Sequence, residues 1–281
     1  MCYSMIIAID GPAGTGKGTI SKLISERLGF VYVDTGAMYR AITLKMLRND
    51  IKVDEFEKIE ELLNTTKIDF VNTEKSDKNF LGTSNEKQIE NASEKTIIQR
   101  VLLDDEDVTG KIRMPDVNEH VSPYSAVKII RAKMVELQRK IAEGKDVIME
   151  GRDITTVVFP NAEIKIYLTA SPEERAKRRY KEFIDKGIQT TYEETLESIN
   201  KRDYNDMNKE VGALKIAEDA IVVDTSELSI EEVYEKIKQI ILDYEAWNNK
   251  LKMQLGRLLI AMSKKWYNVT DLERIRDKHW E

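Results

Sequence analysis

The chain has 281 residues, of which 41% are hydrophobic and 33% charged, with a formal net charge of −6. This composition can form a substantial core, which excludes a wholly disordered chain, and the acidic balance excludes a globally basic nucleic-acid binder. One cysteine and two histidines exclude an intramolecular disulfide and a zinc site of cysteine and histidine. Apolar runs stay far below the ~20 residues that span a bilayer. No basic residue precedes Lys17, so we expect no signal peptide and predict a cytoplasmic protein.

Alternating strand and helix patterns begin at the N-terminus. Residues 5–10 form an apolar run that predicts a buried strand, and a helix is predicted over 17–28, with Gly29 suited to end it. A second strand at 30–34 precedes a helix through Leu47, and another helix starts at Asp54. The polar stretch 68–110 differs, with short β-like pieces at 68–71 and 100–103, and we expect a mobile loop at 74–96.

Regular patterns return in the second half of the chain. A helix is predicted over 125–142, and strands are predicted at 147–149, 164–168 and 221–224. Ser171, Thr191 and Ser229 each begin a capping box, which predicts helix starts, and the last of these helices runs to about Tyr244. Strands that alternate with helices predict an α/β fold with a parallel sheet between helices.

A glycine-rich turn follows the first strand and opens the first helix. It consists of Gly11, Pro12, Ala13, Gly14, Thr15, Gly16, Lys17, Gly18 and Thr19. Backbone N–H groups of such a turn bind phosphates, Lys17 adds a charge near the β and γ phosphates, and Thr19 offers a hydroxyl near magnesium. Gly18 stands where a serine or threonine is usual. The strand–turn–helix context favours a nucleotide-binding P-loop over an ordinary glycine turn.

Two classes of protein share such a loop: small-molecule phosphotransferases and GTP-driven switches. Residues 107–110 and 200–203 match the Asp-x-x-Gly and Asn-Lys-x-Asp patterns of switches. The second pattern, however, ends a polar helix rather than a hydrophobic strand, and Gly18 lacks the hydroxyl that binds magnesium in switches. We therefore favour a phosphotransferase and keep the switch as an alternative.

Charged residues also follow the predicted strands, where ligands bind in open α/β sheets. They lie in Val33–Arg40, in Glu150–Asp153, and later at Arg202 and Asp206. Guanidinium groups bind phosphate oxygens bidentately, so these arginines predict a second anion site for a phosphorylated acceptor. The basic segment 175–181 is compatible either with a solvated helix face or with a lid that closes over the phosphoryl group.

Five motifs together resemble bacterial-type cytidylate kinases, which are nucleoside monophosphate kinases of the P-loop type. The motifs lie at 9–19, 34–40, 150–154, 157–160 and 174–179, and the resemblance extends from residue 5 to about 243. It implies transfer of the γ-phosphoryl group of ATP to CMP or dCMP with Mg²⁺, in pyrimidine nucleotide metabolism. It also implies a parallel-sheet core, a small antiparallel insert at about 64–113 that binds the monophosphate, and a helical lid and acceptor-binding region at about 171–210.

The resemblance also implies roles for individual residues. The catalytic set is Lys17, Arg152, Arg175 and Arg178. Arg40 and Arg152 are expected to hold the acceptor phosphate, and Arg202 and Asp206 the sugar. The cytosine edge is assigned to Ser122, Arg131 and Asp153. The full substrate-binding set is Thr35, Gly36, Tyr39, Arg40, Ser122, Arg131, Arg152, Asp153, Arg202, Asp206 and Lys209. No protein ligand to a metal is assigned.

This chain departs from the family pattern at several positions. Lys209 stands where an arginine is usual and loses the bidentate fork, and Thr155 stands where glycine is usual. The loop at 74–96 is longer than the usual insert, and 244–281 has no counterpart. A kinase for another monophosphate such as UMP is the alternative, but a carboxylate at Asp153 accepts from an exocyclic amine that uracil lacks, which favours cytosine.

The C-terminal segment 244–281 contains all three tryptophans, Trp247, Trp266 and Trp280. Its apolar residues fall on one helical face, and Thr270 begins a capping box that predicts a second short helix. Three interpretations are open: a helical hairpin packed on the chain's own core, a dimer or partner surface, or attachment to a membrane surface. We expect a monomeric core, nucleotides as the ligands, and neither nucleic acid nor a membrane as a partner.

Overall fold

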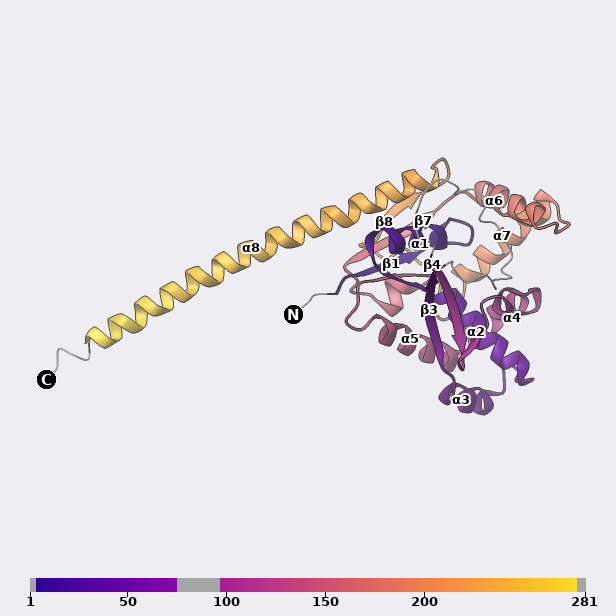
Figure 1. Ribbon diagram of the computed structural model, residues 1–281, viewed down its shortest axis with the longest axis horizontal. Coiled ribbons are helices and arrows are strands. Elements are labelled where there is room, and N and C mark those ends of the chain that lie inside the picture. Colours follow the sequence, from indigo (N-terminus) through magenta and orange to yellow (C-terminus); the bar gives the residue numbers. More distant parts are fainter. Residues whose placement is uncertain (1–3, 75–96, 277–281) are drawn as a thin grey trace. The chain divides into compact units, whose positions relative to one another are not determined.

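A five-stranded parallel sheet forms the centre of the fold in the computed structural model (Figure 1). The structure describes residues 4–74 and 97–276, and for 72–74, 97–98, 252 and 256–276 the backbone alone. The strand order is β2–β6–β1–β7–β8, which places β1 in the middle, between two parallel neighbours. The five strands are β1 (Ile6–Asp10), β2 (Val31–Asp34), β6 (Val147–Gly151), β7 (Ile164–Thr169) and β8 (Ile221–Asp224).

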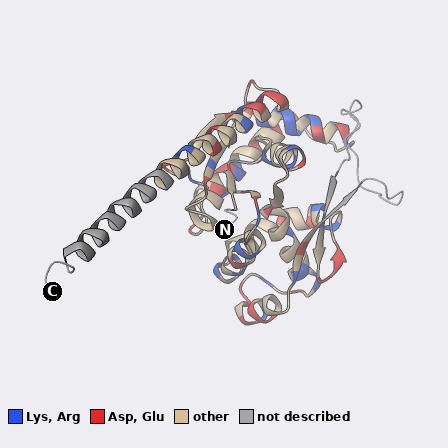
Figure 2. Cartoon of the chain, turned by 60° about the vertical axis from the view of Figure 1, so that its left-hand side comes forward, with Lys and Arg blue, Asp and Glu red and all other residues tan. Residues whose placement is uncertain are grey.

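Helices follow the strands, as the alternating pattern predicts. They are α1 (Lys17–Leu28), α2 (Thr35–Arg48), α3 (Phe56–Asn64), α4 (Pro115–Ala126), α5 (Lys128–Ala142), α6 (Pro172–Asp185), α7 (Tyr192–Met207) and α8 (Ile230–Arg276). Basic and acidic residues are interspersed on these helices in Figure 2. The capping predictions are confirmed: the side chains of Ser171, Thr191 and Ser229 accept from the backbone N–H three residues later.

A second, antiparallel sheet forms the predicted insert. It consists of β3 (Ile68–Glu74), β4 (Ile97–Leu103) and β5 (Glu106–Asp107), followed by the 3₁₀ turn η1 (Lys111–Arg113). Residues 75–96, which contain nearly all of the loop predicted to be mobile, lie outside the described residues. Gln99 ties the insert to the central sheet, because its side chain donates to the carbonyl of Tyr32 on β2 at 2.6 Å.

The helix predicted over 125–142 is divided in the structure. Val127 is extended (φ −69°, ψ 121°) and separates α5 from α4, a helix that sequence patterns missed. Contacts distant in sequence hold α4 in place: Tyr124 is buried, and its hydroxyl donates to the carbonyl of Ile51 at 2.6 Å. The division also places the carbonyl of Ser125 within 3.2 Å of the Arg131 guanidinium.

The C-terminal segment differs from the prediction of two helices. The single helix α8 runs from Ile230 to Arg276, so the predicted helical hairpin is wrong. This range contains no proline and only one glycine, Gly256, and therefore nothing in it breaks the helix before Thr270. The chain divides into two compact units, Met1–Tyr234 and Glu235–Glu281, and the first contains both sheets. No helix in the described ranges is long and apolar enough to cross a membrane.

Candidate active site

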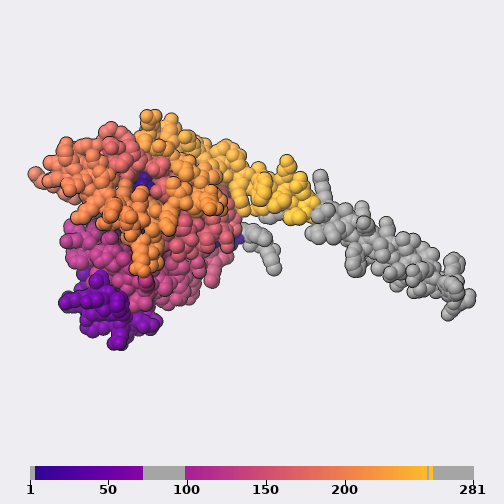
Figure 3. All heavy atoms as spheres, turned by 180° about the vertical axis from the view of Figure 1, so that it is seen from behind, coloured from indigo at the N-terminus to yellow at the C-terminus, as the bar shows by residue number. Residues whose placement is uncertain are grey.

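The turn between β1 and α1 has the backbone shape of a phosphate-binding loop, and we call residues 11–19 the donor loop. Gly14 and Gly16 have φ of 82° and 87°, in the left-handed region that favours glycine. A Cβ on Gly11 would overlap the carbonyl of Leu168 on the neighbouring strand. In Figure 3, indigo atoms from the first part of the chain are visible between atoms of later segments. The glycines therefore let the loop pass close to β7.

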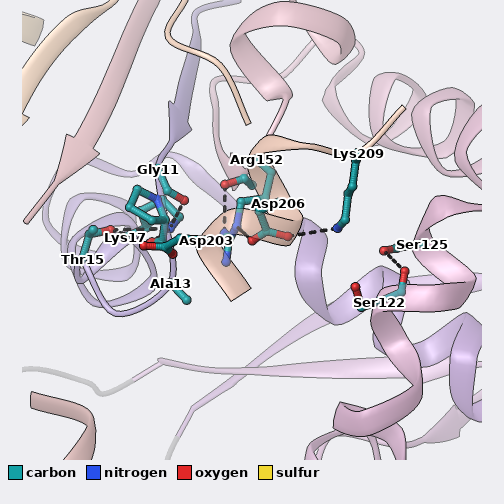
Figure 4. Close-up of polar contacts among 12 residues, drawn as sticks. Gly11, Ala13, Thr15, Lys17, Ser122, Ser125, Arg152, Asp203, Asp206 and Lys209 are labelled. Atoms are coloured by element: carbon teal, nitrogen blue, oxygen red, sulfur yellow. Dashed lines mark hydrogen bonds and ion pairs between the residues drawn. The ribbon is translucent and has the colours of Figure 1, made fainter. Parts of the chain in front are cut away.

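Lys17 holds the donor loop from within. Its ammonium group donates to the carbonyls of Gly11 and Pro12, both at 2.7 Å, and the side chain of Thr15 donates to Pro12 at 3.2 Å (Figure 4). Burial, together with the positive charge of Arg152, lowers the pKa of Lys17 to about 7. Asp10 pairs with Gly151 on the adjacent parallel strand β6, so the donor loop and Arg152 begin side by side at the same edge of the sheet.

Glu150 occupies the space that a side chain at position 18 would need. A Cβ on Gly18 would lie 2.9 Å from Oε1 of Glu150, and the Tyr32 hydroxyl donates to the same oxygen at 2.5 Å. Burial raises the pKa of Glu150, and the negative charge of Asp34 raises it further. From the sequence, Gly18 was noted only because it lacks the hydroxyl of the usual serine or threonine. In the structure, the carboxylate of Glu150 occupies the space that a side chain at position 18 would fill. Thr19 is exposed on the first turn of α1.

The protein groups beside the donor loop suit a magnesium ion only if the ion arrives bound to the phosphates of a nucleotide. Within the described residues, no three His, Cys, Asp or Glu side chains gather into a metal site. Mg²⁺ commonly keeps several waters and binds one or two carboxylates together with substrate phosphates. Glu150 is the carboxylate that lies against Gly18, and it suits that arrangement.

The acceptor cluster, which we define as Arg40, Arg152, Arg202, Asp206 and Lys209, contains four cations and one carboxylate. Asp206 accepts from Nε of Arg152 at 2.8 Å and from Nζ of Lys209 at 3.0 Å (Figure 4). Burial opposes ionisation of Asp206, but the charges of Arg152 and Lys209 outweigh it and lower its pKa to about 2. This carboxylate therefore stays ionised throughout the neutral range.

Positive charge in the cluster exceeds what Asp206 balances. Burial, together with the charges of Arg152 and Arg40, lowers the pKa of Arg202 to about 10. Arg40 pairs with Asp34 at 3.0 Å, while its Nε is buried without a partner among the described residues. Gly36 lies against this pair, because a Cβ there would be 3.1 Å from both partners. Three mutually repelling guanidinium groups make a strong site for a phosphate dianion.

A buried ion pair lies where the cytosine-reading residues are expected. Arg131 and Asp153 form a salt bridge, and the Arg131 guanidinium lies over the ring of Tyr39 at 5.7 Å. Burial raises the pKa of Asp153 to about 6 despite the charge of Arg131. Ser122 is exposed, and its carbonyl accepts from Ser125 at 2.9 Å. The structure thus brings Tyr39, Arg131 and Asp153 together, with Ser122 on the adjoining helix α4.

Gly212 is a site residue that sequence reasoning missed. A Cβ at this position would overlap the guanidinium of Arg131, and Gly212 has a φ of 67°. Any side chain here would displace the Arg131–Asp153 pair. The signal in the sequence was a single glycine after α7, which by itself has no specific meaning.

Arg175 and Arg178, expected in a lid, lie against the donor side. Arg175 is 2% exposed, and its three nitrogens bind the carbonyls of Ala170 and Ala13 and the carboxylate of Asp203. The guanidinium of Arg178 binds the hydroxyl and carbonyl of Thr225, just after β8. Both arginines are therefore fully engaged by protein groups.

Two buried threonines fix the turn that carries Arg152 and Asp153. Thr35 donates to the carbonyl of Glu150 at 2.7 Å. Thr155 begins the π-helical turn η2 (Ile154–Val158) together with Ile154. Its backbone N–H and hydroxyl both donate to Asp10, at 2.7 and 2.6 Å, and Ile154 adds a third bond at 3.0 Å. Asp10 directly precedes the donor loop, so this turn and the loop are tied together.

A phosphate loop after the central strand, with an arginine cluster beside it, defines a P-loop phosphotransferase. Residues 200–203 lie within α7 rather than after a strand, unlike a guanine-reading motif.

Comparison with known proteins identifies the family. A sequence model of the cytidylate kinase family matches residues 7–243. The cytidylate kinase of Caldicellulosiruptor saccharolyticus is 49% identical over 234 residues, which cover 83% of this chain and 94% of the relative. That of Fusobacterium nucleatum is 45% identical over 238 residues, covering 85% and 97%. The chain therefore belongs to the cytidylate kinase family.

Proposed function

We propose that the protein transfers the γ-phosphoryl group of ATP to CMP or dCMP and releases ADP and CDP or dCDP. The observation that carries this proposal is the juxtaposition of the donor loop with the acceptor cluster. The loop follows Asp10 and Arg152 follows Gly151, and Asp10 and Gly151 pair on the adjacent parallel strands β1 and β6. The Arg131–Asp153 pair supplies the means to recognise a base. Family membership over 7–243 supports the same reaction.

Catalysis in this proposal rests on positioning and charge. The acceptor phosphate is already an anion, so no general base is required, and the protein's task is to hold two phosphate groups in line. When ATP binds, the side chain of Lys17 moves from the carbonyls of Gly11 and Pro12 to the phosphates. The negative charge of the phosphates raises the pKa of Lys17, so its amine is protonated in the complex. Arg152 and Arg40 bind the acceptor phosphate. Mg²⁺, carried with ATP and held beside Glu150, would neutralise charge on the β and γ phosphates.

The acceptor phosphate competes with carboxylates for its cations. Arg152 is paired with Asp206, and Arg40 with Asp34, when the site holds no anion. Lys209 also binds Asp206, and so one cation remains with that carboxylate when Arg152 turns to the phosphate. In this arrangement Lys209 acts as a point charge that frees Arg152, a task that does not need the bidentate fork of arginine.

Asp153 favours cytosine over uracil. Cytosine presents an exocyclic amine that donates, whereas uracil has an acceptor at that position. An ionised Asp153 satisfies the amine, while with uracil the buried carboxylate would face another oxygen. A site built to pair with a donor rejects an analogue that lacks it, because the buried polar group is left unpaired. A UMP kinase is thus the less favoured reading.

A phosphotransfer assay with ATP and Mg²⁺ across CMP, dCMP, UMP and AMP tests the proposal. We expect kcat/KM for CMP or dCMP to exceed those for UMP and AMP by about 100-fold or more, as expected for a site built to pair with a donor. Incubation with GTP and no acceptor tests the alternative hypothesis of a GTP-driven switch. We expect the protein to hydrolyse GTP only at the background rate. A higher kcat/KM with UMP or AMP than with both cytidine nucleotides would refute the acceptor assignment.

A further inference from the structure

The carboxylate of Asp203 is buried beneath the donor loop. Its Oδ2 lies 2.6 Å from Nη2 of Arg175, and only 9% of the residue is exposed. The sequence pattern around it, residues 200–203, resembled a guanine-reading motif that the fold excludes, so its buried acid has no assigned task. Asp203 supplies the negative charge that compensates the almost fully buried guanidinium of Arg175.

Arg175 in turn supports the donor loop. Its Nη1 donates to the carbonyl of Ala13 at 3.2 Å, and its Nε donates to Ala170 at 3.0 Å. In a trans peptide the N–H points away from the C=O, so a bond at the carbonyl of Ala13 directs the N–H of Gly14 to the opposite side. A Cβ on Gly14 would lie 3.2 Å from Cβ of Arg175, which shows how closely the loop rests on this side chain. Backbone N–H groups of this loop are the ones that bind phosphate.

A second carboxylate on the same face of α7 holds the acceptor arginine. Asp206 lies three residues after Asp203, and residues at this spacing are neighbours on a helix surface. It is also buried, and it binds Nε of Arg152 at 2.8 Å. Figure 4 shows Asp203 and Asp206 near each other. From one helix face, Asp203 binds Arg175, which supports the donor loop, and Asp206 binds the acceptor arginine Arg152.

We propose that Asp203 is a positioning residue that acts through Arg175 to align the Ala13–Gly14 peptide of the donor loop with the acceptor site held by Asp206. Asp203 touches neither nucleotide. Because α7 carries both carboxylates, occupation of the acceptor site, which draws Arg152 away from Asp206, acts through α7 on the peptide that binds the phosphates of ATP. The two nucleotides then assist each other's binding. This inference rests on the proposed transfer between ATP and CMP.

A purely structural salt bridge would give a different result. Its loss would lower the melting temperature and the fraction of folded enzyme, but each folded molecule would bind both nucleotides as before. Loss of a positioning residue changes the KM for ATP and the dependence of CMP affinity on bound ATP analogue. Binding free energies couple reciprocally, so each nucleotide should change the affinity of the other by the same factor.

The test compares the wild type with three variants. Asp203→Asn keeps the shape and removes the charge. The double variant Arg175→Met, Asp203→Leu removes both charges and avoids an uncompensated buried cation, so it retains the fold if the single variant does not. Glu197→Gln, at an exposed position of the same helix, is the matched control for loss of one acidic charge.

Titration calorimetry measures CMP affinity with and without a saturating non-hydrolysable ATP analogue and Mg²⁺, and circular dichroism measures folding. We expect the analogue to tighten CMP binding to the wild type and to Glu197→Gln by about five- to tenfold, a typical size for coupling between sites. In folded Asp203→Asn and in the double variant this ratio should approach one, and the KM for ATP should rise about tenfold.

Two results would overturn the inference. The first is a wild type whose CMP affinity is the same with and without the ATP analogue. The second is a set of folded Asp203 variants in which both this affinity ratio and the KM for ATP equal those of the wild type. Failure of the proposed function is distinct from either, because it would appear as a wild type that neither binds nor phosphorylates CMP.

Discussion

The donor loop and the acceptor cluster hold their cations in opposite ways. In the donor loop, the ammonium of Lys17 binds the backbone carbonyls of Gly11 and Pro12, both at 2.7 Å. In the acceptor region three arginines instead pair with carboxylates: Arg40 with Asp34, Arg152 with Asp206 and Arg131 with Asp153. One site is built from backbone, and the other from exchangeable side-chain pairs.

This difference separates what each site contributes. A backbone cradle is preorganised and binds the phosphates that every ATP-dependent enzyme must bind. Ion pairs hold their charges in balance until an anion of the right shape replaces a carboxylate, which gives selectivity at some cost in affinity. Changes to acceptor side chains should therefore alter turnover and substrate choice without weakening ATP binding.

The largest expected effect is that of Arg152→Ala. Loss of the guanidinium removes the main ligand of the acceptor phosphate, and kcat/KM for CMP should fall about 1,000-fold, the upper range for a group that stabilises transition-state charge. Affinity for an ATP analogue should not fall in calorimetry, since the donor loop is intact. Arg48→Ala, at an exposed pair with Glu106, is the control. A parallel loss of analogue affinity would contradict the separation of the two sites.

Asp153→Asn should reduce base discrimination. The amide presents a donor as well as an acceptor, and the CMP/UMP ratio of kcat/KM should fall about 10- to 100-fold in steady-state assays. Since the pKa of Asp153 is raised to about 6, its ionised form should be lost as the pH falls below 6, and wild-type activity with CMP should fall with it.

The phosphate of CMP titrates in the same range, near pH 6. It does so equally for the wild type and for Asp153→Asn, so the difference between the two pH profiles isolates Asp153. Identical profiles and an unchanged CMP/UMP ratio would show that this carboxylate does not read the base.

On the donor side, ATP binding should take up protons. Lys17 has a pKa lowered to about 7, so about 0.9 of it is neutral at pH 8 in the free enzyme. The charge of the bound phosphates raises this pKa, and binding should take up about one proton per molecule at pH 8 and much less at pH 6. Calorimetry in buffers of different ionisation enthalpy measures this uptake, with Lys17→Met as the variant that should abolish it. Equal uptake at both pH values would contradict the assignment.

Local signals in the sequence predicted much of the fold. The helix over 17–28 has the predicted bounds because a left-handed glycine flanks it at each end, and three capping boxes marked helix starts correctly. The division at Val127 was missed, since it depends on the contact of Tyr124 with Ile51 far away in sequence. Thr270 was taken as a helix start because a capping pattern has the same letters inside a continuous helix.

The site residues show the same limit. Motifs placed Arg152 and Asp153 after a strand, and the structure pairs Arg152 with Asp206 and Asp153 with Arg131. Motifs could not reveal that Gly212 packs on Arg131, or that Arg175 faces the donor loop from below. Both facts depend on how the chain after β7 folds back over the sheet, and no local pattern encodes that.

Thr155→Val should have a moderate effect on stability. The valine keeps the shape but removes a buried hydroxyl that donates to Asp10 at 2.6 Å, which should cost about 1–3 kcal/mol in urea unfolding. Burial raises the pKa of Asp10 and the bond from Thr155 lowers it, so the bond favours the ionised form. The substitution should therefore lower the free energy of unfolding more at pH 7, where Asp10 is ionised, than below the pKa of Asp10. Thr155→Ser keeps the hydroxyl and serves as control; equal losses in both variants would assign the effect to packing.

The smallest expected effect on catalysis is that of deleting 244–281. The donor loop and the acceptor cluster lie within residues 11–209, and the family match ends at 243, so kcat/KM should change less than about twofold. The same deletion should abolish tryptophan fluorescence, since Trp247, Trp266 and Trp280 are all removed.

Light scattering on the full and shortened chains then decides the role of the segment. A fall from the mass of two chains to one would show that this part of α8 pairs copies of the protein, because an amphipathic helix suits a partner helix. An unchanged monomeric mass would exclude pairing. A loss of activity with unchanged mass would contradict the restriction of both phosphate sites to the first unit.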